Sequence, residues 1–314
     1  MCNMPGREKT MQTTYVRLAM SVIEVILVLA IVAVLIGLVV PAVQRVRELA
    51  ERTKCVNNMK QLTVALQNYA NNRRGGLPHL IVNDVAVPGK TGIPFVSVFP
   101  ALLEELEGSA ILEDVAFGRN LDRPLYQFLC PSDPTTTHPY HQQISYAANG
   151  QVFLAPDPTR KLSILFADGT ANTIVFGEHY SRLYHANGAV RVSYNWLQTR
   201  NDPPYKGPNG IVYIRLTSFA AVENLAQYKA DLDDVYPVTM GVPRVSVGSV
   251  RGLTFQVRPN PVEADMRICH TPHAAGMVSG FADGHVRVLK GGMAEEVFWA
   301  LVTPAGGEIV TLEE

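Results

Sequence analysis

An excess of charge of either sign is missing from this chain, because 27 basic residues balance 28 acidic residues and the net charge is −1. This balance gives no electrostatic basis for binding nucleic acid, and none is expected as a partner. Cysteine is also scarce. Four cysteines in 314 residues, with no Cys-x2-Cys pair, exclude a small disulfide-rich scaffold and a zinc-finger spacing. At 47% hydrophobic residues, the chain can bury one large or two ordinary cores.

Sequence motifs of common enzymes are absent as well. The chain has no Gly-x-Ser-x-Gly, no Walker loop and no His-Glu-x-x-His, so neither a nucleophile nor a phosphate cradle is indicated. The acidic cluster Glu104, Glu105 and Glu107 accompanies a short predicted helix and is interpreted as a solvated face. We therefore expect no enzyme activity and no cofactor.

One long apolar run is present at residues 20–40, and it contains a single charged residue, Glu24. As a helix, these roughly 21 residues span about 31 Å, which matches a hydrocarbon core of about 30 Å. A cleaved signal peptide has a shorter apolar core followed by a small-x-small site. Val40-Pro41-Ala42 imitates that site only weakly, so we predict a single transmembrane helix.

Glu24 is the unusual residue of this span, because a carboxylate in an apolar helix costs on the order of 2.5–3.5 kcal/mol. One interpretation is that Glu24 lies near the membrane interface and reaches water. The other interpretation is functional, since an ionisable residue inside a membrane usually has a purpose. The string Arg17-Leu18-Ala19-Met20-Ser21-Val22-Ile23-Glu24 resembles the cleavage and methylation site of type IV prepilins.

This resemblance implies that a prepilin peptidase cuts between Ala19 and Met20, and that the new amine of Met20 is methylated. Glu24 then becomes the fifth mature residue and Pro41 the twenty-second, as in that family. The sequence departs from the family at Ala19, where glycine is usual, and at Met20, where phenylalanine is usual. In an assembly, the Glu24 carboxylate of one subunit would neutralise the Met20 amine of its neighbour.

Basic residues precede and follow the span in similar numbers, so their count does not decide the orientation. The prepilin resemblance implies a leader at residues 1–19 in the cytoplasm and export of everything after the span at 20–40. The expected fold is α+β and pilin-like: an extension of the N-terminal helix, or stem, at 41–74, then an exported domain at 75–314.

The stem is predicted from apolar residues at three- and four-residue steps, namely Val46, Leu49, Ala50, Met59, Leu62, Leu66 and Tyr69. Pro41 should kink this helix, and Arg73-Arg74-Gly75-Gly76 should end it. From about Val56 onward we expect it to pack on its own domain, and before that residue on neighbouring subunits.

After residue 77 the chain changes to short β-branched runs, such as 210–214 and 245–250, which predict a strand-rich domain. Residues 99–106 and 222–228 are rich in Ala and Leu and are expected to be helical. Residues 201–210 are expected to be a loop, because Pro, Gly, Asn and Asp dominate there.

His273 and Asp283-Gly284 form a His-x9-Asp-Gly pattern that resembles the signature of a large prepilin-like family of unknown function, expanded in planctomycetes. Further blocks resemble the same family at both ends and in the middle of the chain. They are Leu129-Cys130-Pro131-Ser132-Asp133, Asp168-Gly169-Thr170-Ala171-Asn172-Thr173 with Gly177-Glu178, Phe255-Gln256-Val257-Arg258-Pro259, Trp299-Ala300-Leu301 and Thr303-Pro304-Ala305-Gly306-Gly307-Glu308. Residues 180–250 resemble it least.

Asp283-Gly284 is interpreted as a two-residue hairpin turn, since this dipeptide supplies the positive φ that such turns need. Pairing Ala282 with His285 would place Phe281 opposite Val286, with both side chains facing the core. This gives the motif a structural role.

A metal site is the alternative interpretation of this region, since imidazole and carboxylate groups are good ligands for zinc or a similar ion. The candidate ligands are His270, His273, Asp283 and His285. Two of the four lie beside a surface turn, so the structural interpretation is preferred, with His273 hydrogen-bonding the turn or its neighbours. No metal is expected at this group.

Cys2 would leave with the leader, so the mature chain would keep Cys55, Cys130 and Cys269, one more than a single bridge can use. Cysteine is frequent in the resembled family at the positions of Cys55 and Cys130, which implies a Cys55–Cys130 disulfide with Cys269 free. The alternative is three buried thiols that pack as small hydrophobes. Sequence does not show whether two Cα atoms approach within about 7 Å.

The expected function is that of a pseudopilin- or minor-pilin-like structural subunit of a type II secretion or type IV pilus-like system. Its expected partners are a prepilin peptidase, other pilin or pseudopilin subunits and the cytoplasmic membrane, which it crosses once. An alternative is a membrane-tethered extracytoplasmic binding domain that uses the prepilin start only for export and anchoring. A metal-dependent exported enzyme is a third, less favoured class.

Overall fold

The computed structural model describes residues 21–79, 82–87, 90–95, 98–106, 111, 124–136, 142–153, 161–184, 186–188, 190–193, 205–206, 212–213, 218–219, 254–265 and 268–307. The chain divides into two compact units, residues 1–48 and residues 49–314. Helix α1, Val22–Asn72, contributes its first part to one unit and its second part to the other.

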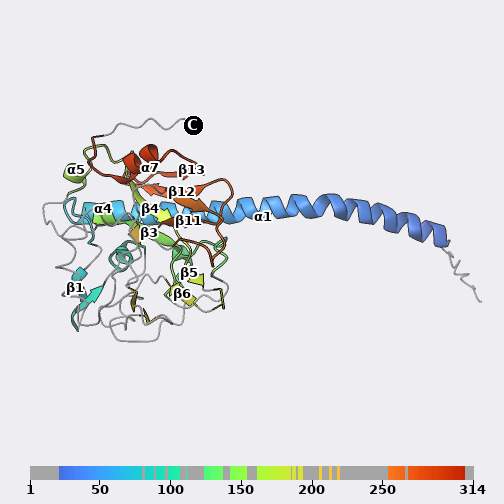
Figure 1. The fold of residues 1–314 in the computed structure, drawn as a ribbon, viewed down its shortest axis with the longest axis horizontal. Helices are drawn as coiled ribbons and strands as arrows, with labels where there is room; N and C mark the ends of the chain where they lie inside the picture. The colour runs from blue at the N-terminus through green and yellow to red at the C-terminus, as the bar shows by residue number, and fades with distance from the viewer. Residues whose placement is uncertain are drawn as a thin grey trace, which may run out of the picture. The chain divides into compact units, whose positions relative to one another are not determined.

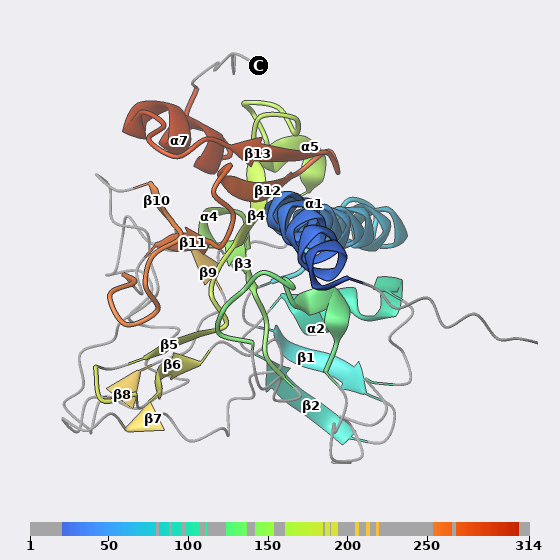
Figure 2. The same cartoon turned by 90° about the vertical axis from the view of Figure 1, so that its right-hand side faces the viewer.

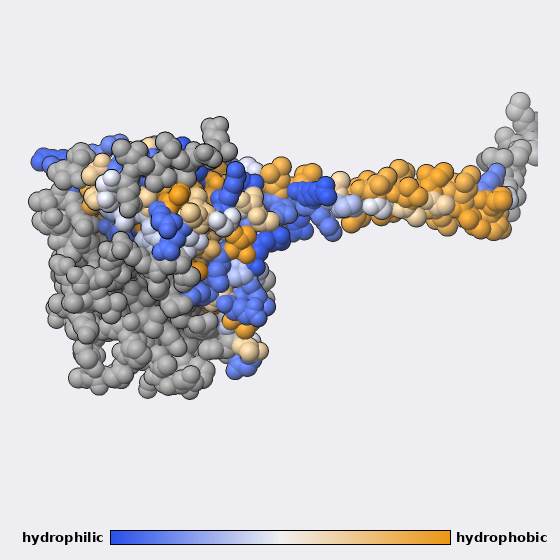
Figure 3. All heavy atoms as spheres, turned by 45° about the horizontal axis from the view of Figure 1, so that its top comes forward, coloured by the Kyte–Doolittle hydropathy of each residue, from blue (hydrophilic) through white to orange (hydrophobic). Residues whose placement is uncertain are grey.

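In the first unit, residues 25–43 of α1 are apolar on all sides. Its large hydrophobic side chains at positions 22–40 are between 41% and 75% exposed, and they form an apolar surface on this part of the helix (Figure 3). Among the described helices, α1 is the one that is long and apolar enough to cross a membrane. The helix continues through Pro41, although proline cannot donate the backbone hydrogen bond expected there.

In the second unit, α1 buries one side. Its buried residues recur at helical spacing and are Cys55, Met59, Leu62, Thr63, Ala65, Leu66 and Ala70. The prediction that the helix packs on its own domain from about Val56 onward is therefore confirmed. The helix ends at Asn72, where Arg74 and Gly75 have positive φ angles of 54° and 87° and Gly75 donates its N–H to the carbonyl of Ala70.

A five-stranded sheet forms the centre of this unit (Figure 1). Its order is β13 (Val286–Leu289), β12 (Met277–Phe281), β4 (Ile174–Glu178), β3 (Tyr146–Asn149) and β9 (Ser218–Phe219). All neighbouring strands are antiparallel except β3 and β9. The expected α+β class, a long helix followed by a strand-rich domain, is confirmed.

The sheet is covered on both faces. Side chains of α1 share one buried cluster with Val278 and Phe176, whereas helix α7 (Glu295–Val302) shares a second cluster with Phe281 and Ile174. Figure 2 shows α1 and α7 on either side of β12. Strand β12 is therefore buried on both faces, as the burial of all five of its residues indicates.

Smaller elements surround this centre. Among the residues that the structure describes, four two-stranded sheets pair β1 (Val82–Val87) with β2 (Lys90–Phe95), β5 (Arg182–Tyr184) with β6 (Val190–Ser193), β7 (Tyr205–Lys206) with β8 (Val212–Tyr213), and β10 (Phe255–Val257) with β11 (Cys269–Thr271). The short helices are α2 (Phe99–Leu102), α4 (Gly150–Phe153), α5 (Leu162–Leu165) and two 3-10 turns, Glu104–Leu106 and Tyr126–Phe128.

Some predicted elements differ in detail. The helix expected at 99–106 is interrupted, since α2 ends at Leu102 and a separate 3-10 turn follows. The expected run 210–214 contains β8, and the expected loop 201–210 contains the two residues of β7. The predicted helix at 222–228 and strand at 245–250 lie outside the described residues.

The hairpin between β12 and β13 corrects the predicted register. Gly280, not Phe281, lies opposite Val286. Phe281 donates its backbone N–H to the carbonyl of His285, so residues 282–284 form a three-residue turn in which Gly284 has a φ of 92°. The predicted two-residue turn is therefore wrong: the turn has three residues, and the pairing of β12 with β13 is shifted by one residue.

This one-residue shift of register changes the face of the sheet on which each side chain lies. Phe281 packs with the α7 cluster, where its ring stacks on His285 with centroids 4.3 Å apart. Val286 and Val288 pack instead against the α1 cluster. The predicted common face for Phe281 and Val286 is therefore wrong.

Strand β12 approaches α1 closely at Gly280. A Cβ atom added to Gly280 would lie 2.4 Å from Cγ2 of Thr63 and 3.1 Å from Sδ of Met59. We expect Gly280→Ala to lower the free energy of unfolding by about 2 kcal/mol, because overpacking forces one of these elements to move. Equilibrium urea unfolding of the purified chain measures this difference.

Thr63→Ser supplies the matched control for this substitution. It removes the clashing methyl group and keeps the hydroxyl that bonds the carbonyls of Lys60 and Gly284. The double variant Thr63→Ser/Gly280→Ala should recover part of the loss. A strictly additive double variant would contradict the proposed clash.

Candidate functional site

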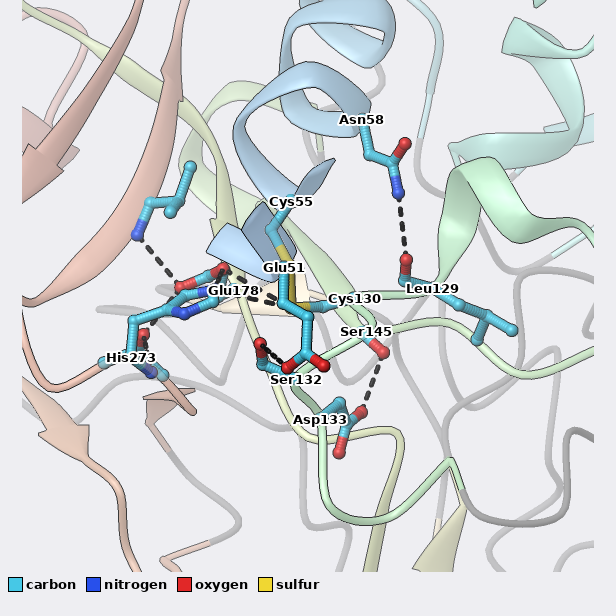
Figure 4. Close-up of a disulfide and its surroundings, with 12 residues drawn as sticks. Glu51, Cys55, Asn58, Leu129, Cys130, Ser132, Asp133, Ser145, Glu178 and His273 are labelled. Atoms are coloured by element: carbon cyan, nitrogen blue, oxygen red, sulfur yellow. Dashed lines mark hydrogen bonds and ion pairs between the residues drawn. A yellow bond between two sulfur atoms is a disulfide. The ribbon is translucent and has the colours of Figure 1, made fainter. Parts of the chain in front are cut away.

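A disulfide joins helix α1 to the segment that follows the 3-10 turn at Tyr126–Phe128. Cys55 on α1 is bonded to Cys130, with the two Cα atoms 5.1 Å apart and both side chains buried. Nearly one helical turn further along, Asn58 Nδ2 donates hydrogen bonds to the carbonyls of Leu129 (2.9 Å) and Tyr126 (3.2 Å). The segment is thus held to α1 by one covalent and two polar contacts (Figure 4).

Glu178 and His273 lie beside this disulfide (Figure 4). His273 Nε2 is 3.1 Å from Glu178 Oε1 and 3.5 Å from Cys130 Sγ. Both side chains are buried, and that of Glu178 has no exposed surface. A carboxylate at such depth must be hydrogen-bonded or paired.

Two neighbouring strands supply hydrogen-bond partners for Glu178. Glu178 ends β4 and its Oε2 accepts hydrogen bonds from Thr271 Oγ1 of β11 (2.7 Å) and from the backbone N–H of Val278 in β12 (3.0 Å). Thr271 Oγ1 in turn accepts the N–H of His273 at 3.1 Å. One carboxylate oxygen is therefore fixed by the strands, while the other faces His273 and the disulfide.

Asp133 organises the loop that carries Cys130. Its buried carboxylate accepts hydrogen bonds from Thr135, from Ser145 Oγ (2.7 Å) and from the backbone N–H of Ser181 (2.8 Å). Burial raises the pKa of Asp133, although the hydrogen bonds from Thr135 and Ser145 oppose that change. The Cys-Pro-Ser-Asp string is thus anchored at both ends, to α1 through Cys130 and, through Asp133, to the residues that directly precede β3 and β5.

His270 and His179 form a second buried group. The His270 ring lies 4.7 Å from the His179 ring and 5.3 Å from the Tyr180 ring, and His270 Nε2 donates to the carbonyl of Asp265 at 2.8 Å. Burial lowers the pKa of His270 to about 4. Burial and the neighbouring His270 lower the pKa of His179 well below its usual value.

The four residues of the predicted metal alternative belong to different environments. His273 contacts Glu178, His270 stacks near Tyr180, and His285 pairs with Asp283 at the β12–β13 turn. Within the described ranges, the group of His, Cys, Asp and Glu residues close enough to share an ion is instead Cys55, Cys130, Glu178 and His273.

The two halves of the His-x9-Asp-Gly motif have separate structural tasks. His273 binds Glu178, whereas the turn containing Asp283 and Gly284 docks on α1. The carbonyl of Gly284 accepts from Lys60 Nζ (2.6 Å) and from Thr63 Oγ1 (3.1 Å), and Gln67 Nε2 donates to the carbonyl of Ala282. The side-chain contacts of His273 are therefore with Glu178 and Cys130 rather than with the turn.

Glu178 is the residue of this site that sequence reasoning missed. Gly177-Glu178 belongs to a block that resembles the family, but nothing in that block indicates a role for the carboxylate. The available signal is an acid two residues after the apolar run Ile174-Val175-Phe176, since a strand buried on both faces has no solvated position for a charge.

The other predicted residues lie elsewhere. Ala19 and Met20 are outside the described residues, whereas Glu24 occupies the first turn of α1, where its Oε2 accepts the N–H of Ser21 at 2.9 Å. Cys269 is buried and free. Glu104 and Glu105 pair with Arg73 at 3.0 and 3.3 Å, and Glu107 is outside the described residues.

An apolar N-terminal helix, a mostly antiparallel sheet packed on its continuation, and a buried Cys-Cys-Glu-His cluster define an α+β protein with a candidate membrane anchor. The chain belongs to the family described as "Protein of unknown function (DUF1559)", whose model matches residues 44–293. This is the planctomycete-expanded family that the motifs resemble, and that prediction is confirmed. No curated protein and no solved structure matches the chain.

Proposed function

We propose that the protein is a pseudopilin- or minor-pilin-like structural subunit. In this proposal α1 anchors it in the cytoplasmic membrane, a prepilin peptidase removes residues 1–19, and the mature chain assembles through α1 with other pilin or pseudopilin subunits. The large domain lies on the extracytoplasmic side. The protein acts through assembly rather than catalysis.

The observation that carries this proposal is the dual use of one helix. Helix α1 begins in the exposed apolar run and ends as a core element of the domain, with no linker between the two parts. A cleavable signal segment has no reason to continue as a helix into the core of the protein that it exports. Continuity of this kind supports a membrane anchor that stays attached to the large domain.

Apolar residues beyond the span support contacts with other subunits. Val43, Val46 and Leu49 are 58%, 67% and 61% exposed, although they follow the apolar run. Their three-residue spacing places them on one side of α1. Exposed large apolar groups arranged in this way are typical of a surface that packs against a partner helix.

The first test concerns the N-terminus. We expect the mature chain in membranes to begin at Met20 with a methylated amine, when the host has an active prepilin peptidase. Mass spectrometry of the N-terminal peptide measures this, and a host lacking the peptidase is the control. Recovery of the intact leader in both hosts would contradict processing.

The second test concerns Glu24. We expect Glu24→Gln to insert normally, because the span becomes more apolar, and to reduce incorporation into assemblies by roughly tenfold or more, which corresponds to about 1.4 kcal/mol of lost amine pairing. Co-purification of tagged and untagged subunits measures incorporation, with Glu48→Gln on the same helix as the matched control. Normal incorporation of Glu24→Gln would exclude the amine pairing.

These experiments also separate the alternative function. A chain that is processed and anchored, yet never co-purifies with another subunit, would fit a tethered binding domain instead. Such a result would agree with α1 as a membrane anchor and would contradict the proposed role in assembly.

A further inference from the structure

Four ligand-type atoms from four separate segments converge in the buried cluster beside α1. Sγ of Cys55, Sγ of Cys130, Nε2 of His273 and a carboxylate oxygen of Glu178 all lie within 4.8 Å of one another. Three of the separations are 3.1 Å for His273–Glu178, 3.5 Å for His273–Cys130 and 3.9 Å for Cys130–Glu178. All four side chains are buried.

These separations are close to those within a tetrahedral zinc site. Zn–S bonds of about 2.3 Å and Zn–N or Zn–O bonds of about 2.0–2.1 Å give ligand-to-ligand distances of about 3.3–3.8 Å. The three non-covalent separations above fall in or near that range. The two sulfur atoms, which are bonded to each other, would have to move apart.

The surroundings already orient the ligands. Oε2 of Glu178 is held by Thr271 and by the backbone N–H of Val278, which leaves Oε1 directed at the cluster. Cys55 is held on α1, and Cys130 lies next to the Leu129 carbonyl that Asn58 binds. Hydrogen bonds behind the ligands are what a metal site needs in order to form without large rearrangement.

We propose that Cys55, Cys130, His273 and Glu178 bind one Zn²⁺ when the disulfide is reduced, so that disulfide and metal are alternative ways of closing the same site. A dithiol reductant transfers two electrons and two protons to the disulfide, yielding two thiols and its own disulfide. Zn²⁺ then displaces the two thiol protons. This proposal is independent of the proposed assembly function.

The ligand set favours zinc among common ions. Two thiolates and an imidazole are soft ligands that select Zn²⁺ over Mg²⁺ and Ca²⁺. Four protein ligands with no open position are typical of a structural rather than a catalytic zinc site. Cys269 is not a ligand, since it is absent from this group and burial next to Glu178 raises the pKa of its thiol.

The test is metal titration of the full chain, purified in detergent, with Co²⁺ as a spectroscopic probe. After reduction under anaerobic conditions, we expect one Co²⁺ per chain, with the visible bands of tetrahedral coordination and a thiolate-to-cobalt charge-transfer band. Zn²⁺ should displace it. The oxidised chain should show none of these bands.

Variants identify the ligands. Cys55→Ser and Cys130→Ser should each weaken the charge-transfer band, and His273→Ala and Glu178→Gln should each reduce affinity at least tenfold. Cys269→Ser, a buried cysteine outside the set, should bind as the unmodified chain does. Equal binding by Cys55→Ser and the unmodified chain would overturn the proposal.

Folding of the reduced chain is monitored in the same samples by near-ultraviolet circular dichroism. If reduction alone loosens the domain, stoichiometric Zn²⁺ should restore the spectrum, because binding to the folded state stabilises it. A reduced chain that binds no metal, or whose spectrum Zn²⁺ does not restore, would overturn the proposal.

Discussion

Loss of the Cys55–Cys130 disulfide is expected to lower the free energy of unfolding of the 49–314 unit by roughly 4 kcal/mol. The bridge joins residues 75 positions apart, and closing a loop of that length removes much of the entropy of the unfolded chain. Most domains have a total stability of about 5–15 kcal/mol. This one bond therefore accounts for a large part of the stability.

Urea unfolding of the oxidised chain and of Cys55→Ala/Cys130→Ala measures this effect, with a chelator present so that no metal replaces the bridge. Alanine is preferred to serine because both positions are buried and a serine hydroxyl would need a partner there. Cys269→Ala is the matched control, since it removes a buried thiol without a bridge. If Cys55→Ala/Cys130→Ala and Cys269→Ala lower the free energy of unfolding by about the same amount, the disulfide contributes only through packing.

Acidification is expected to destabilise the domain by about 3 kcal/mol between pH 7 and pH 4 through His270 alone. The pKa of His270 in the folded chain is about 4, against 6.5 for an unperturbed histidine, and each unit of difference corresponds to about 1.36 kcal/mol. The unfolded chain therefore takes up the proton first. The stability is complete above about pH 6.5 and is lost as the pH falls towards 4.

Other buried groups modify this pH dependence. His179 acts in the same direction, since its pKa is also lowered by burial. Asp133 acts oppositely, because its raised pKa means that the folded state binds a proton more tightly than the unfolded state. Its contribution partly offsets the loss at the acid end of the range.

Urea unfolding at a series of pH values, for the chain and for His270→Phe, tests this prediction. The free energy of unfolding of the variant should depend less steeply on pH between pH 6.5 and pH 4. The difference in slope should correspond to the uptake of about one proton on unfolding. Tyr180→Phe is the control in the same cluster, since burial raises the pKa of Tyr180 and the residue stays neutral throughout. An unchanged slope in His270→Phe would show that its ring is accessible to protons in the folded state.

Sequence patterns predicted the elements that are determined by residues near one another in the chain. The helical spacing of Met59, Leu62 and Leu66 placed one side of α1 in the core, and Gly75 supplied the positive φ that ends it. The β12–β13 register was not predictable in this way. Asp-Gly suits both a two-residue turn and a three-residue turn with glycine last, and a strand buried on both faces offers no polar alternation to decide between them.

The site was predicted in pieces for a similar reason. His273 and Asp283 were visible as a motif, but their partners are distant in sequence: Glu178 lies on β4, and Lys60 and Gln67 lie on α1. Which strand pairs with which is a property of the whole sheet. No local pattern could therefore reveal that Glu178 faces His273, and the Cys55–Cys130 pairing was implied by the family resemblance rather than by a local pattern.

The docking of the β12–β13 turn on α1 also constrains the order of folding. Lys60, Thr63 and Gln67 bind carbonyl groups that lie 224, 221 and 215 positions later in the chain. Contacts so distant in sequence form slowly, because long loops must close first. During synthesis the sheet that covers the inner side of α1 stays incomplete until residues 277–289 have emerged. Helix α1 is thus synthesised first, and the domain completes its folding only after the β12–β13 hairpin has been synthesised. A chain truncated before this hairpin would expose an apolar face of α1 and would be prone to aggregate.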